Sequence, residues 1–536
     1  MLQISELRTP VEADEETLIR KVCRSLRIGR DEIRAFSIAR RSIDARRKPE
    51  LYFCDTVRVA LKDERLEHAV LKKCRHKNVM SYNPIRYRFS GAEAAGSGAS
   101  PIVIGAGPAG LFCAYLLAQH GYRPLLLERG EEAEARKERV SRFWSGGPLD
   151  PDSNVQFGEG GAGTFSDGKL NTGVHDRSGR NTYVLETFVK MGAPEDILYD
   201  AKPHLGTDRL VGIVRSMRKE IIRLGGTVRF RTRVDDLIIR DGAIRGVVTS
   251  DGTRIESDAV VLAVGHSARD TFRMLNEKAV PMERKSFAVG VRVEHPQELI
   301  NLAQYGTANP RRTGPAPYRL THRCAGGRGV YSFCMCPGGY VVNASSEPGH
   351  LVVNGMSDRA RDGINANSAI VVTVGPDDFL PYVPEGGDPV LSGVYFQREL
   401  ERRAFAQKEG AVPVQRYGDF LRAAEGTVGS IAPQIRGKFA PANLRSVLPD
   451  PIGEDLCEGM ERFGRKIRGF SDEDAMLSGI ESRTSSPVRV LRDDTGQSAV
   501  RGLFPCGEGA GYAGGITSAA IDGIRTAEKI AEFRRE

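Results

Sequence analysis

The sequence predicts an α/β protein of three domains, one of which is discontinuous and encloses another. Two glycine-rich turns, each between a short apolar strand and a helix, occur far apart at residues 101–111 and 502–516. They predict the two ends of one parallel-sheet domain. The residues between 270 and 490 are rich in proline and glycine and show little helical regularity, which favours an inserted mixed-sheet domain. We therefore expect domains at 1–90, at 101–270 with 491–536, and at 271–490, with a flexible linker at 91–100.

Segment 1–90 is predicted to be a small α/β domain with a basic surface. Strand candidates lie at 2–7, 34–44 and 51–61, and helices are expected around 18–26 and at about 64–76. This β-α-β-β-α order suggests a ferredoxin-like fold. The 21 basic and 13 acidic residues of the segment account for the whole net charge of +8. Such a surface could hold RNA or another anionic partner. Few aromatic residues and the lack of an RNA-binding signature favour a solvated face instead.

Residues 101–111 form a G-x-G-x-x-G motif between a strand and a helix. Gly105 permits a tight turn, Gly107 lets the backbone approach a pyrophosphate, and Gly110 allows close packing of the helix on the strand. The start of the helix offers free N–H groups to phosphates. Glu128 ends the next apolar run, 18 residues after Gly110, near the spacing at which an acid reaches a ribose hydroxyl. Together these features predict a Rossmann-like dinucleotide site rather than an incidental glycine turn.

A second glycine-rich segment, 158–168, places five glycines in eleven residues. This composition argues against a helix or a central strand and favours backbone that lies flat against a ligand and donates N–H groups to it. Gly160, Gly161 and Gly163 are the candidates for such contacts, and an ordinary flexible loop is the alternative. An exposed helix is expected before this segment, at 131–142.

The remaining elements return the chain to the predicted parallel sheet. A helix at 207–225 capped by Thr207, strands at 227–239 and 243–250, and an apolar strand at 259–264 lead to Gly265. Strand candidates in the inserted domain lie at 287–293, 329–335, 340–344 and 369–374, with one helix candidate at 394–407. Near the end, a strand reaches Gly507-Glu508, and a closing helix is expected from Ile516 to about 533.

These separated motifs resemble the glutathione-reductase-like class of flavoproteins. More specifically, the segments 157–170 and 331–339 resemble bacterial FAD-dependent dehydrogenases of the NAD(FAD)-utilising kind, and the likeness extends over nearly the whole chain. The resemblance implies a Rossmann-like FAD-binding domain with an inserted substrate domain. NADH or NADPH would then be a diffusible electron donor, because no second complete G-x-G-x-x-G unit is present.

The resemblance also implies where FAD would lie. Gly105, Gly107 and Gly110 would hold the pyrophosphate, Glu128 the adenosine ribose, and Val234 the adenine through its backbone. The closing helix would point its positive end at the pyrimidine edge of the flavin. The full set of implied cofactor-binding residues is Gly105, Gly107, Pro108, Ala109, Gly110, Glu128, Arg129, Gly160, Gly161, Gly163, Val234, Gly265, Gly507, Glu508, Gly515 and Ile516.

Candidate catalytic groups are few. Cys334 and Cys336 bracket one residue of an apparent strand, so both side chains are expected on one face, where they are either redox-active or part of a packed strand. His266 follows Gly265 directly and could line the pocket, and Lys169 or Tyr512 could position an anionic or carbonyl substrate. Cys506 would be a third thiol near the flavin. No metal-ligand spacing is apparent, so no metal is expected.

The leading hypothesis is an FAD-dependent oxidoreductase that acts on a small organic substrate by hydride transfer. The alternatives are an RNA-associated flavoprotein of the tRNA-modifying type, which would use the basic segment 1–90, and a prenyl-lipid reductase, which would need a long apolar tunnel. Nine scattered cysteines, no apolar run long enough to span a membrane and no signal-peptide pattern predict a cytoplasmic location.

Overall fold

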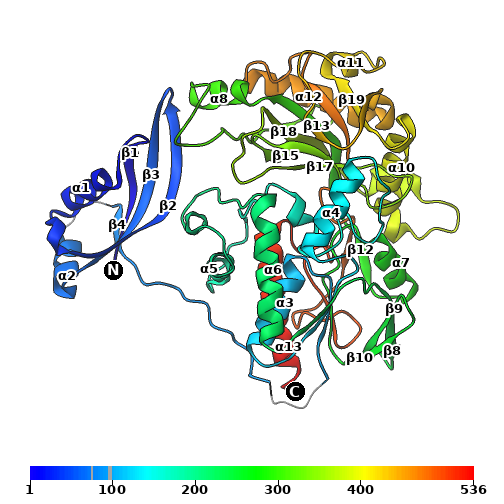
Figure 1. Cartoon of the computed structure of the whole chain (residues 1–536), viewed down its shortest axis with the longest axis horizontal. Helices are drawn as coiled ribbons and strands as arrows, with labels where there is room; N and C mark the ends of the chain where they lie inside the picture. Colours follow the sequence, from blue (N-terminus) through cyan, green and yellow to red (C-terminus); the bar gives the residue numbers. More distant parts are fainter. Residues whose placement is uncertain (74–76, 95–98, 536) are drawn as a thin grey trace.

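The structure, a computed structural model, describes residues 1–73, 77–94 and 99–535. The end of the helix expected at 64–76 and the centre of the expected linker therefore lie outside the described residues. Figure 1 shows three bodies: an amino-terminal domain on the left, a nucleotide-binding domain at the lower centre and a cap domain above it. Within the described part of the chain, no helix is both long and apolar enough to cross a membrane.

The amino-terminal domain has the predicted ferredoxin-like fold. Its elements are β1 (Leu2–Pro10), α1 (Glu15–Leu26), β2 (Ile33–Arg47), β3 (Glu50–Leu61), α2 (Glu64–Lys73) and β4 (Val79–Ser81), and the sheet order is β2-β3-β1-β4. The sequence analysis missed β4, whose three residues pair with the start of β1. The hairpin of β2 and β3 extends toward the cap (Figure 1), and Leu51 is buried in the cap's core.

A five-stranded parallel sheet of order β24-β11-β5-β6-β7 forms the centre of the nucleotide-binding domain. The strands are β5 (Ile102–Ile104), β6 (Leu125–Leu127), β7 (Thr227–Arg229), β11 (Val260–Leu262) and β24 (Leu503–Pro505). Val103, Leu126 and Val261 pack with α3 (Pro108–Gln119), α6 (Thr207–Arg223) and α13 (Ile516–Phe533). The residues before and after these three in each strand point to the opposite face of the sheet. There they pack with the meander of β8 (Val234–Arg240), β9 (Ala243–Thr249) and β10 (Arg254–Glu256). Both faces are thus covered, as the uniformly apolar strands predict.

Four local expectations in this domain were wrong. The strand expected at 227–239 is two strands in different sheets, because the chain turns between them at Arg231, whose φ is 52°. Gly206, not Thr207, occupies the N-cap of α6, and the Thr207 hydroxyl donates to the Ser166 carbonyl instead. Within the second glycine-rich segment, residues 161–165 form a short 3₁₀ helix. The helix expected to be exposed at 131–142 is α4 (Ala133–Trp144), and its Arg136 is fully buried.

The cap domain contains the expected mixed sheets. Its seven-stranded sheet has the order β14-β15-β18-β13-β22-β19-β21, with β19 and β21 parallel and the other pairs antiparallel. These strands are β14 (Thr321–Arg323), β15 (Gly329–Cys336), β18 (Asn365–Val374), β13 (Phe287–Pro296), β22 (Met476–Glu481), β19 (Val412–Arg416) and β21 (Phe439–Pro441). A smaller sheet holds β17 (Val353–Met356), β16 (Tyr340–Asn343) and β20 (Ile435–Arg436). The pair β12 (Met282–Arg284) and β23 (Val488–Val490) lies where the chain enters and leaves the cap.

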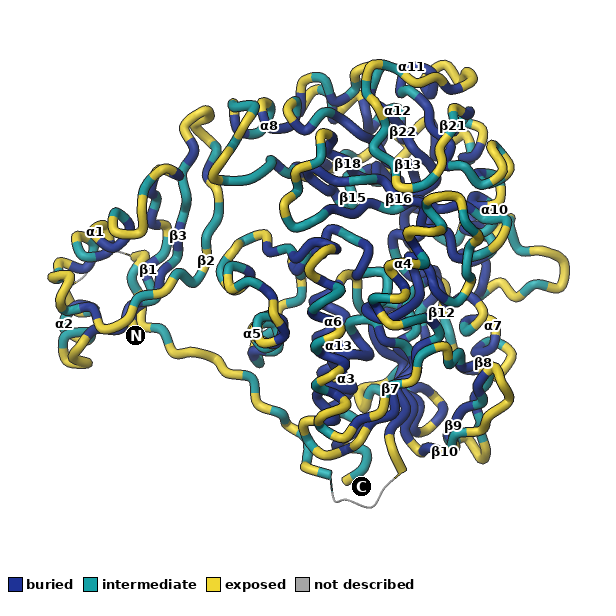
Figure 2. The backbone as a smooth tube through the Cα atoms, in the orientation of Figure 1, coloured by how far each residue is buried: buried dark blue, intermediate teal, exposed yellow. Residues whose placement is uncertain are grey.

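The cap also contains helices that the sequence analysis did not predict. The expected helix is α10 (Ser392–Gln407), and α8 (Gln297–Tyr305), α9 (Pro376–Phe379), α11 (Tyr417–Leu421) and α12 (Asp450–Lys466) are additional. The helix α7 (Arg269–Glu277), also not predicted, packs against β8 of the nucleotide-binding domain. Three glycines within α12 obscure its pattern, although Ile452, Leu456, Met460 and Phe463 are buried at helical spacing. Figure 2 shows buried backbone concentrated in the two large domains and along their contact. The helix α5 (Arg180–Lys190), which precedes α6 in the nucleotide-binding domain, packs against α13.

Candidate cofactor and active site

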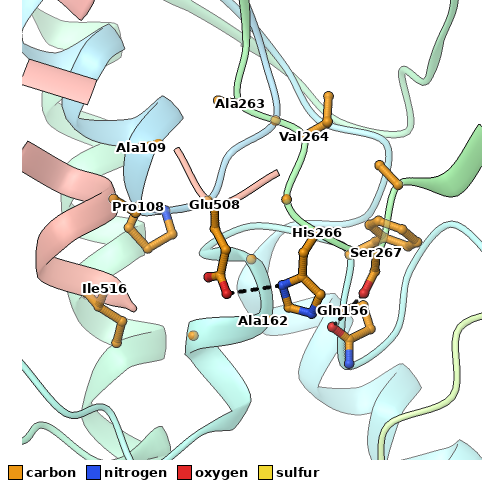
Figure 3. Close-up of a pocket in the computed structure, with 18 of the residues that line it drawn as sticks. Pro108, Ala109, Gln156, Ala162, Ala263, Val264, His266, Ser267, Glu508 and Ile516 are labelled. Carbon is orange, nitrogen blue, oxygen red and sulfur yellow. Dashed lines mark hydrogen bonds and ion pairs between the residues drawn. The ribbon is translucent and has the colours of Figure 1, made fainter. Parts of the chain in front are cut away.

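One cavity of about 440 Å³ lies between the nucleotide-binding domain and the cap. The turn before α3, the glycine-rich segment, the end of β11 and the start of α13 form its nucleotide-side wall, shown in part in Figure 3. The cap closes the other side with Phe333, Cys334, Asn354, Glu481, Arg483 and Thr484. Four segments that are well separated in sequence, at 105–109, 156–169, 263–268 and 514–516, therefore meet at one site.

Most of the predicted site residues line this cavity. They are Gly105, Gly107, Pro108, Ala109, Glu128, Arg129, Gly161, Gly163, Val234, Gly265, Glu508, Gly515 and Ile516, together with Lys169, His266 and Cys334. Gly110, Gly160, Gly507 and Cys336 lie behind the wall. A Cβ atom at Gly110 would stand 1.9 Å from the carbonyl oxygen of Gly105, so this glycine serves helix packing.

The glycines along this wall are of two kinds: one is required by the turn itself, and the others leave open space beside the backbone. Gly105 has a φ of 100°, and a Cβ atom there would lie 2.4 Å from the Ala263 carbonyl oxygen. Around Gly107, Gly265 and Gly515, by contrast, a Cβ atom would meet at most one described atom within 4 Å. A flat ligand with phosphates can therefore approach the backbone at these positions, as the motif predicts.

Glu128 is almost fully buried and holds three backbone segments together. Its Oε2 accepts from the Ala106 N–H at 2.7 Å, and its Oε1 accepts from Gly130 at 2.9 Å and Gly158 at 3.0 Å. The acid at the end of β6 thus ties the first glycine turn to the glycine-rich segment. The carboxylate still lines the cavity, so a ligand hydroxyl can reach it.

Arg136 organises the glycine-rich segment from behind. Its guanidinium donates to the carbonyl oxygens of Asn154, Val155, Gly158, Glu159 and Gly161 at 2.8–3.2 Å. Burial lowers the pKa of this arginine to about 10, although Glu128 and Glu159 favour its charged form. The sequence analysis missed this role. Its one signal is that Arg136 shares a helix face with the apolar Ala133 and Val140, which are also buried.

The amino-terminal end of α13 faces the cavity through Gly515 and Ile516. Asp522, about two turns further along the helix, accepts from the Gly507 N–H at 2.8 Å and from Arg492 at 2.7 Å. These bonds fix the turn that carries Glu508. Figure 3 shows the Glu508 carboxylate directed at His266, with Oε1 and Nδ1 3.5 Å apart. An acid and an imidazole therefore lie side by side in the wall.

A lysine and an arginine share one buried acid on the cap side. Asp167 contacts Lys169 at 2.8 Å and also pairs with Arg361. Burial alone would raise the pKa of Asp167, but the two cations hold it below its usual range. Burial would lower the pKa of Lys169, yet Asp167 and the two nearby cysteines raise it. The trio carries a net positive charge at the cavity wall.

The structure brings Cys334 and Cys336 together, but not by the geometry that a regular strand predicts. Cys334 has a φ of 45°, and the register of β15 shifts between Phe333 and Cys336, so the strand alternation is broken there. Cys334 lines the cavity, whereas Cys336 is buried behind it with its sulfur 4.0 Å from Lys169 Nζ. The Cys336 thiol donates to the backbone carbonyl oxygen of Cys334 at 3.2 Å, so the two residues remain in contact.

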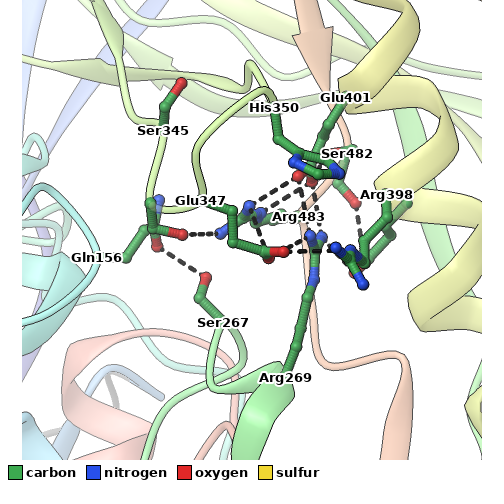
Figure 4. Close-up of polar contacts among 12 residues, drawn as sticks. Gln156, Ser267, Arg269, Ser345, Glu347, His350, Arg398, Glu401, Ser482 and Arg483 are labelled. Carbon is green, nitrogen blue, oxygen red and sulfur yellow. Dashed lines mark hydrogen bonds and ion pairs between the residues drawn. The ribbon is translucent and has the colours of Figure 1, made fainter. Parts of the chain in front are cut away.

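A buried polar network joins the two domains at one end of the cavity (Figure 4). Glu401 of α10 accepts from Arg269 of α7 and from Arg483 beside β22, each at 2.7 Å. Burial alone would raise the pKa of Glu401, but the two arginines hold it well below its usual range. Arg483 lines the cavity, so this network fixes part of the cap wall to the nucleotide-binding domain.

Two other predicted candidates lie away from the cavity. The Tyr512 hydroxyl accepts from the Arg492 N–H at 3.1 Å, and Cys506 is buried with a pKa raised by desolvation. The sequence analysis also gave no sign of a convergence of His322, Cys324 and Glu458 on the cap, where histidine and glutamate are 2.7 Å apart.

Comparison with protein-family profiles supports a flavoprotein. Residues 286–484 match the profile "FAD-dependent protein, C-terminal domain-like", and residues 103–140 match an NAD(P)-binding Rossmann-like domain. Residues 1–60 match a domain of unknown function. The glycine cradle, the helix terminus and the length of the cavity between two domains fit FAD. FAD is therefore the cofactor, and the fold and site define an FAD-dependent oxidoreductase.

The family follows from a close relative. An uncharacterized protein of Clostridium beijerinckii is 46% identical over 542 residues, which covers 99% of this chain and 98% of that protein. The chain belongs to the same family as that protein, and the profile matches make it a family of FAD-dependent flavoproteins, which is the broader part of what the resemblance implied.

Solved structures are similar only in a general way. The chain resembles a quinol fumarate reductase of E. coli with 13% identity, a TM-score of 0.36, and coverage of 82% of this chain and 71% of that one. Glycine oxidase from Bacillus cereus gives 12% identity, a TM-score of 0.32, and coverage of 81% and 97%. At these scores the likenesses carry no argument about activity.

Proposed function

We propose that this flavoprotein oxidises or reduces a small organic substrate that binds between the cap and the flavin. The observation that carries the proposal is the cavity itself. Its nucleotide-side wall is mostly backbone with open glycines, and its cap wall supplies Cys334, Asn354, Glu481, Arg483 and the neighbouring Lys169. The first wall suits a cofactor and the second suits a polar substrate.

Bound there, FAD would supply the two-electron chemistry. The residues of this chain would bind and orient it: the turn at Gly105–Ala109 at the pyrophosphate, Glu128 at the ribose, and the start of α13 at the pyrimidine edge. His266 and Glu508 are placed to hold a proton close to that edge. Lys169 would attract a substrate with negative or carbonyl character.

The alternatives from the sequence receive less support. For RNA binding, Arg41 already forms an ion pair with Asp55, and Arg8 forms one with Asp44. These two arginines therefore have acidic partners inside the amino-terminal domain. A prenyl chain would need an apolar tunnel, whereas charged and polar side chains line the cap end of this cavity. We therefore keep the small polar substrate as the proposal.

A cofactor-binding variant tests this function. A valine side chain at Gly107 would point into open cavity, so Gly107→Val should abolish the flavin absorption of the purified protein while leaving it folded. Gly212→Ala on the open face of α6 is the matched control and should retain flavin. Stopped-flow reduction of the wild-type flavin by NADH, NADPH and a panel of small metabolites would then identify the donor and the substrate. A wild-type protein that never takes up FAD would refute the proposal.

A further inference from the structure

Two thiols lie at the cap end of the cavity in an unusual backbone conformation. Cys334 is partly exposed and lines the cavity, while Cys336 is fully buried beside it. A φ of 45° is uncommon for a residue with a Cβ atom and often marks functional sites. It turns Cys334 out of the strand alternation and toward the cavity.

Positive charge surrounds this pair. Lys169 Nζ lies 4.0 Å from the Cys336 sulfur, and the Arg292 guanidinium donates to the Cys334 carbonyl oxygen at 3.3 Å. The neighbouring Cys336 thiol and the charges of Lys169 and Arg292 hold the pKa of the Cys334 thiol well below its usual range, although desolvation acts in the opposite direction. Reactive cysteines occur in partly exposed, electropositive surroundings of this kind.

The other described cysteines provide a contrast. Burial raises the pKa of Cys113, Cys324 and Cys506, and none of the three lines the cavity. Cys334 therefore differs from them in exposure, in charge environment and in having a second cysteine whose thiol donates to its carbonyl oxygen. These three features together indicate a chemical role rather than packing.

The spacing permits a bond between the two sulfurs. Two residues separated by one are at most about 7 Å apart at their Cα atoms even in an extended chain. Disulfides require about 4.4–6.8 Å, which overlaps the range open to two residues at this spacing. The Cys336 sulfur already lies 3.2 Å from the Cys334 carbonyl oxygen, so the two cysteines are close neighbours in the fold.

We propose that Cys334 and Cys336 form a redox-active dithiol, which exchanges electrons with the flavin and with a thiol or disulfide substrate in the cavity. This inference rests on the proposed function and names the substrate class. Cys334 is the attacking sulfur because it faces the cavity. Cys336 is the resolving sulfur because it is buried behind Cys334 and out of reach of a substrate.

The exchange balances in atoms and electrons. The Cys334 thiolate attacks one sulfur of a substrate disulfide, whose S–S bond breaks, and the leaving thiolate takes a proton. Cys336 then attacks the Cys334 sulfur, loses its proton, and releases the second substrate thiol as the intramolecular disulfide forms. The substrate gains two electrons and two protons; the enzyme pair loses two electrons and the Cys336 proton, and the second proton comes from solvent. Bound FAD in its reduced form would supply the two electrons that return the pair to thiolate and thiol, and a reduced nicotinamide dinucleotide would reduce the flavin again.

Peptide masses test the pair without any activity assay. The full-length protein is equilibrated in glutathione buffers of increasing oxidation, quenched with acid, alkylated and digested with trypsin. The peptide 329–359 contains Cys334 and Cys336 and no other cysteine. We expect it to lose two hydrogens and both alkyl groups as the buffer becomes oxidising, and to regain both alkyl groups in reducing buffer. Two alkylated thiols throughout, or a stable glutathione adduct on Cys334 alone, would overturn the proposal.

A pair of lysine variants tests whether the charge of Lys169 lowers the pKa of the Cys334 thiol. Lys169→Met should raise the pKa of Cys334 and so shift the pH profile of alkylation upward; at pH values below that pKa, a rise of one unit slows alkylation about tenfold. Lys137→Ala, an exposed lysine on α4, is the matched control and should leave the profile unchanged. An unshifted profile in Lys169→Met would remove the lysine from the mechanism that activates Cys334.

Anaerobic reduction links the thiols to the flavin. The oxidised wild-type protein should take up four electrons per chain, two in FAD and two in the disulfide, whereas Cys334→Ser and Cys336→Ser should take up only two. Cys54→Ser in the amino-terminal domain is the control and should take up four. Equal uptake in all four proteins would contradict the dithiol while the flavin function stands. Absence of flavin would contradict the proposed function, and the peptide masses would still decide on the thiol pair.

Discussion

The two walls of the cavity are built in different ways. On the nucleotide side, Glu128 and Arg136 are buried and bond almost entirely to backbone groups, so they fix the path of the glycine segments. On the cap side, the buried Arg292 bonds to side chains: to Glu481 at 2.8 Å, Asn367 at 2.6 Å and Asn354 at 3.2 Å. The buried charged residues of the nucleotide side hold backbone segments in place. The buried arginine of the cap side is instead paired with side chains, one of which is an acid of opposite charge.

This difference corresponds to what each wall has to do. A cofactor with phosphates needs fixed N–H donors and glycines, and a buried arginine can hold that backbone without entering the site itself. A substrate wall needs side chains with adjusted protonation states, which buried ion pairs provide. We therefore expect substitutions in the nucleotide wall to lower the unfolding free energy and the flavin content. Substitutions in the cap wall should lower the unfolding free energy by leaving a buried charge unpaired.

The largest expected effect is at Arg136. Arg136→Leu leaves five carbonyl groups without their donor, so we expect a loss of unfolding free energy of about 3–5 kcal/mol together with loss of bound flavin. Urea denaturation and flavin content measure both. Lys137→Ala, the adjacent exposed lysine, should change neither. Retention of flavin with only a small loss of stability would mean that the glycine-rich segment does not depend on this arginine.

The next effect tests charge balance in the cap. Arg292→Met leaves Glu481 buried without its cation, so it should cost about 3 kcal/mol at neutral pH. The double variant Arg292→Met/Glu481→Gln should recover most of that loss, because no unpaired charge remains. A double-mutant cycle by urea denaturation measures the coupling. Additive losses would show that Arg292 acts through its other contacts, including the Cys334 carbonyl.

A smaller effect is expected on the pH dependence of the unfolding free energy, to which one buried carboxyl group in each domain contributes. Burial raises the pKa of Glu294 in the cap and of Glu159 in the nucleotide-binding domain, each to about 7. A carboxyl group with a raised folded-state pKa holds a proton that the unfolded chain has lost. The unfolding free energy therefore falls as the pH rises from about 4.5 to about 7, and it is level above that.

Glutamine at either position should remove the share of this slope that comes from that carboxyl group. Glu294→Gln should gain up to about 3 kcal/mol on the wild type between pH 5 and pH 8, since Glu294 Oε2 has no hydrogen-bond partner within the described structure. Glu159→Gln should gain less, because it also loses the contact of Glu159 with Arg218 at 3.2 Å. Urea denaturation at the two pH values is the measurement. Curves for Glu294→Gln that stay parallel to the wild type would exclude Glu294 as the titrating group.

The sequence predicted the nucleotide wall well because its signal is local. Gly105, Gly107 and Glu128 lie within one strand-helix-strand unit, and each has a residue type that its backbone position requires. The closing helix was predicted at its observed bounds, Ile516–Phe533, for the same reason. Arg136 was not predicted, because a charged residue in a charged stretch looks exposed until the glycine-rich segment folds over it.

The cap wall was predicted poorly because its partners are distant in sequence. Arg292 and Glu481 are 189 residues apart, and Arg269 and Glu401 are 132 apart. No periodicity or spacing connects such pairs. The paired cysteines were noted from their proximity in sequence, but the positive φ that directs Cys334 to the cavity has no sequence signal, because the residue is not glycine.

The smallest effect concerns the contact between the two walls. Trp144, the only tryptophan of the chain, lies on α4 and donates through Nε1 to the Asn343 carbonyl oxygen of β16 at 2.9 Å. Its ring stands nearly perpendicular to that of Phe165. Trp144→Phe keeps an aromatic ring but loses the hydrogen bond, so the expected cost is about 1 kcal/mol, with flavin retained.

Circular dichroism during urea denaturation measures this loss, because the variant has no tryptophan fluorescence. Trp144→Leu should cost more, and the difference between the two variants gives the share of the ring contact with Phe165. If Trp144→Phe cost as much as Arg136→Leu, the shape of the nucleotide wall would depend on its contact with the cap. The two walls would then not be built independently. A small cost with retained flavin would instead place the stability of the glycine-rich segment in its own domain, at Arg136 and Glu128.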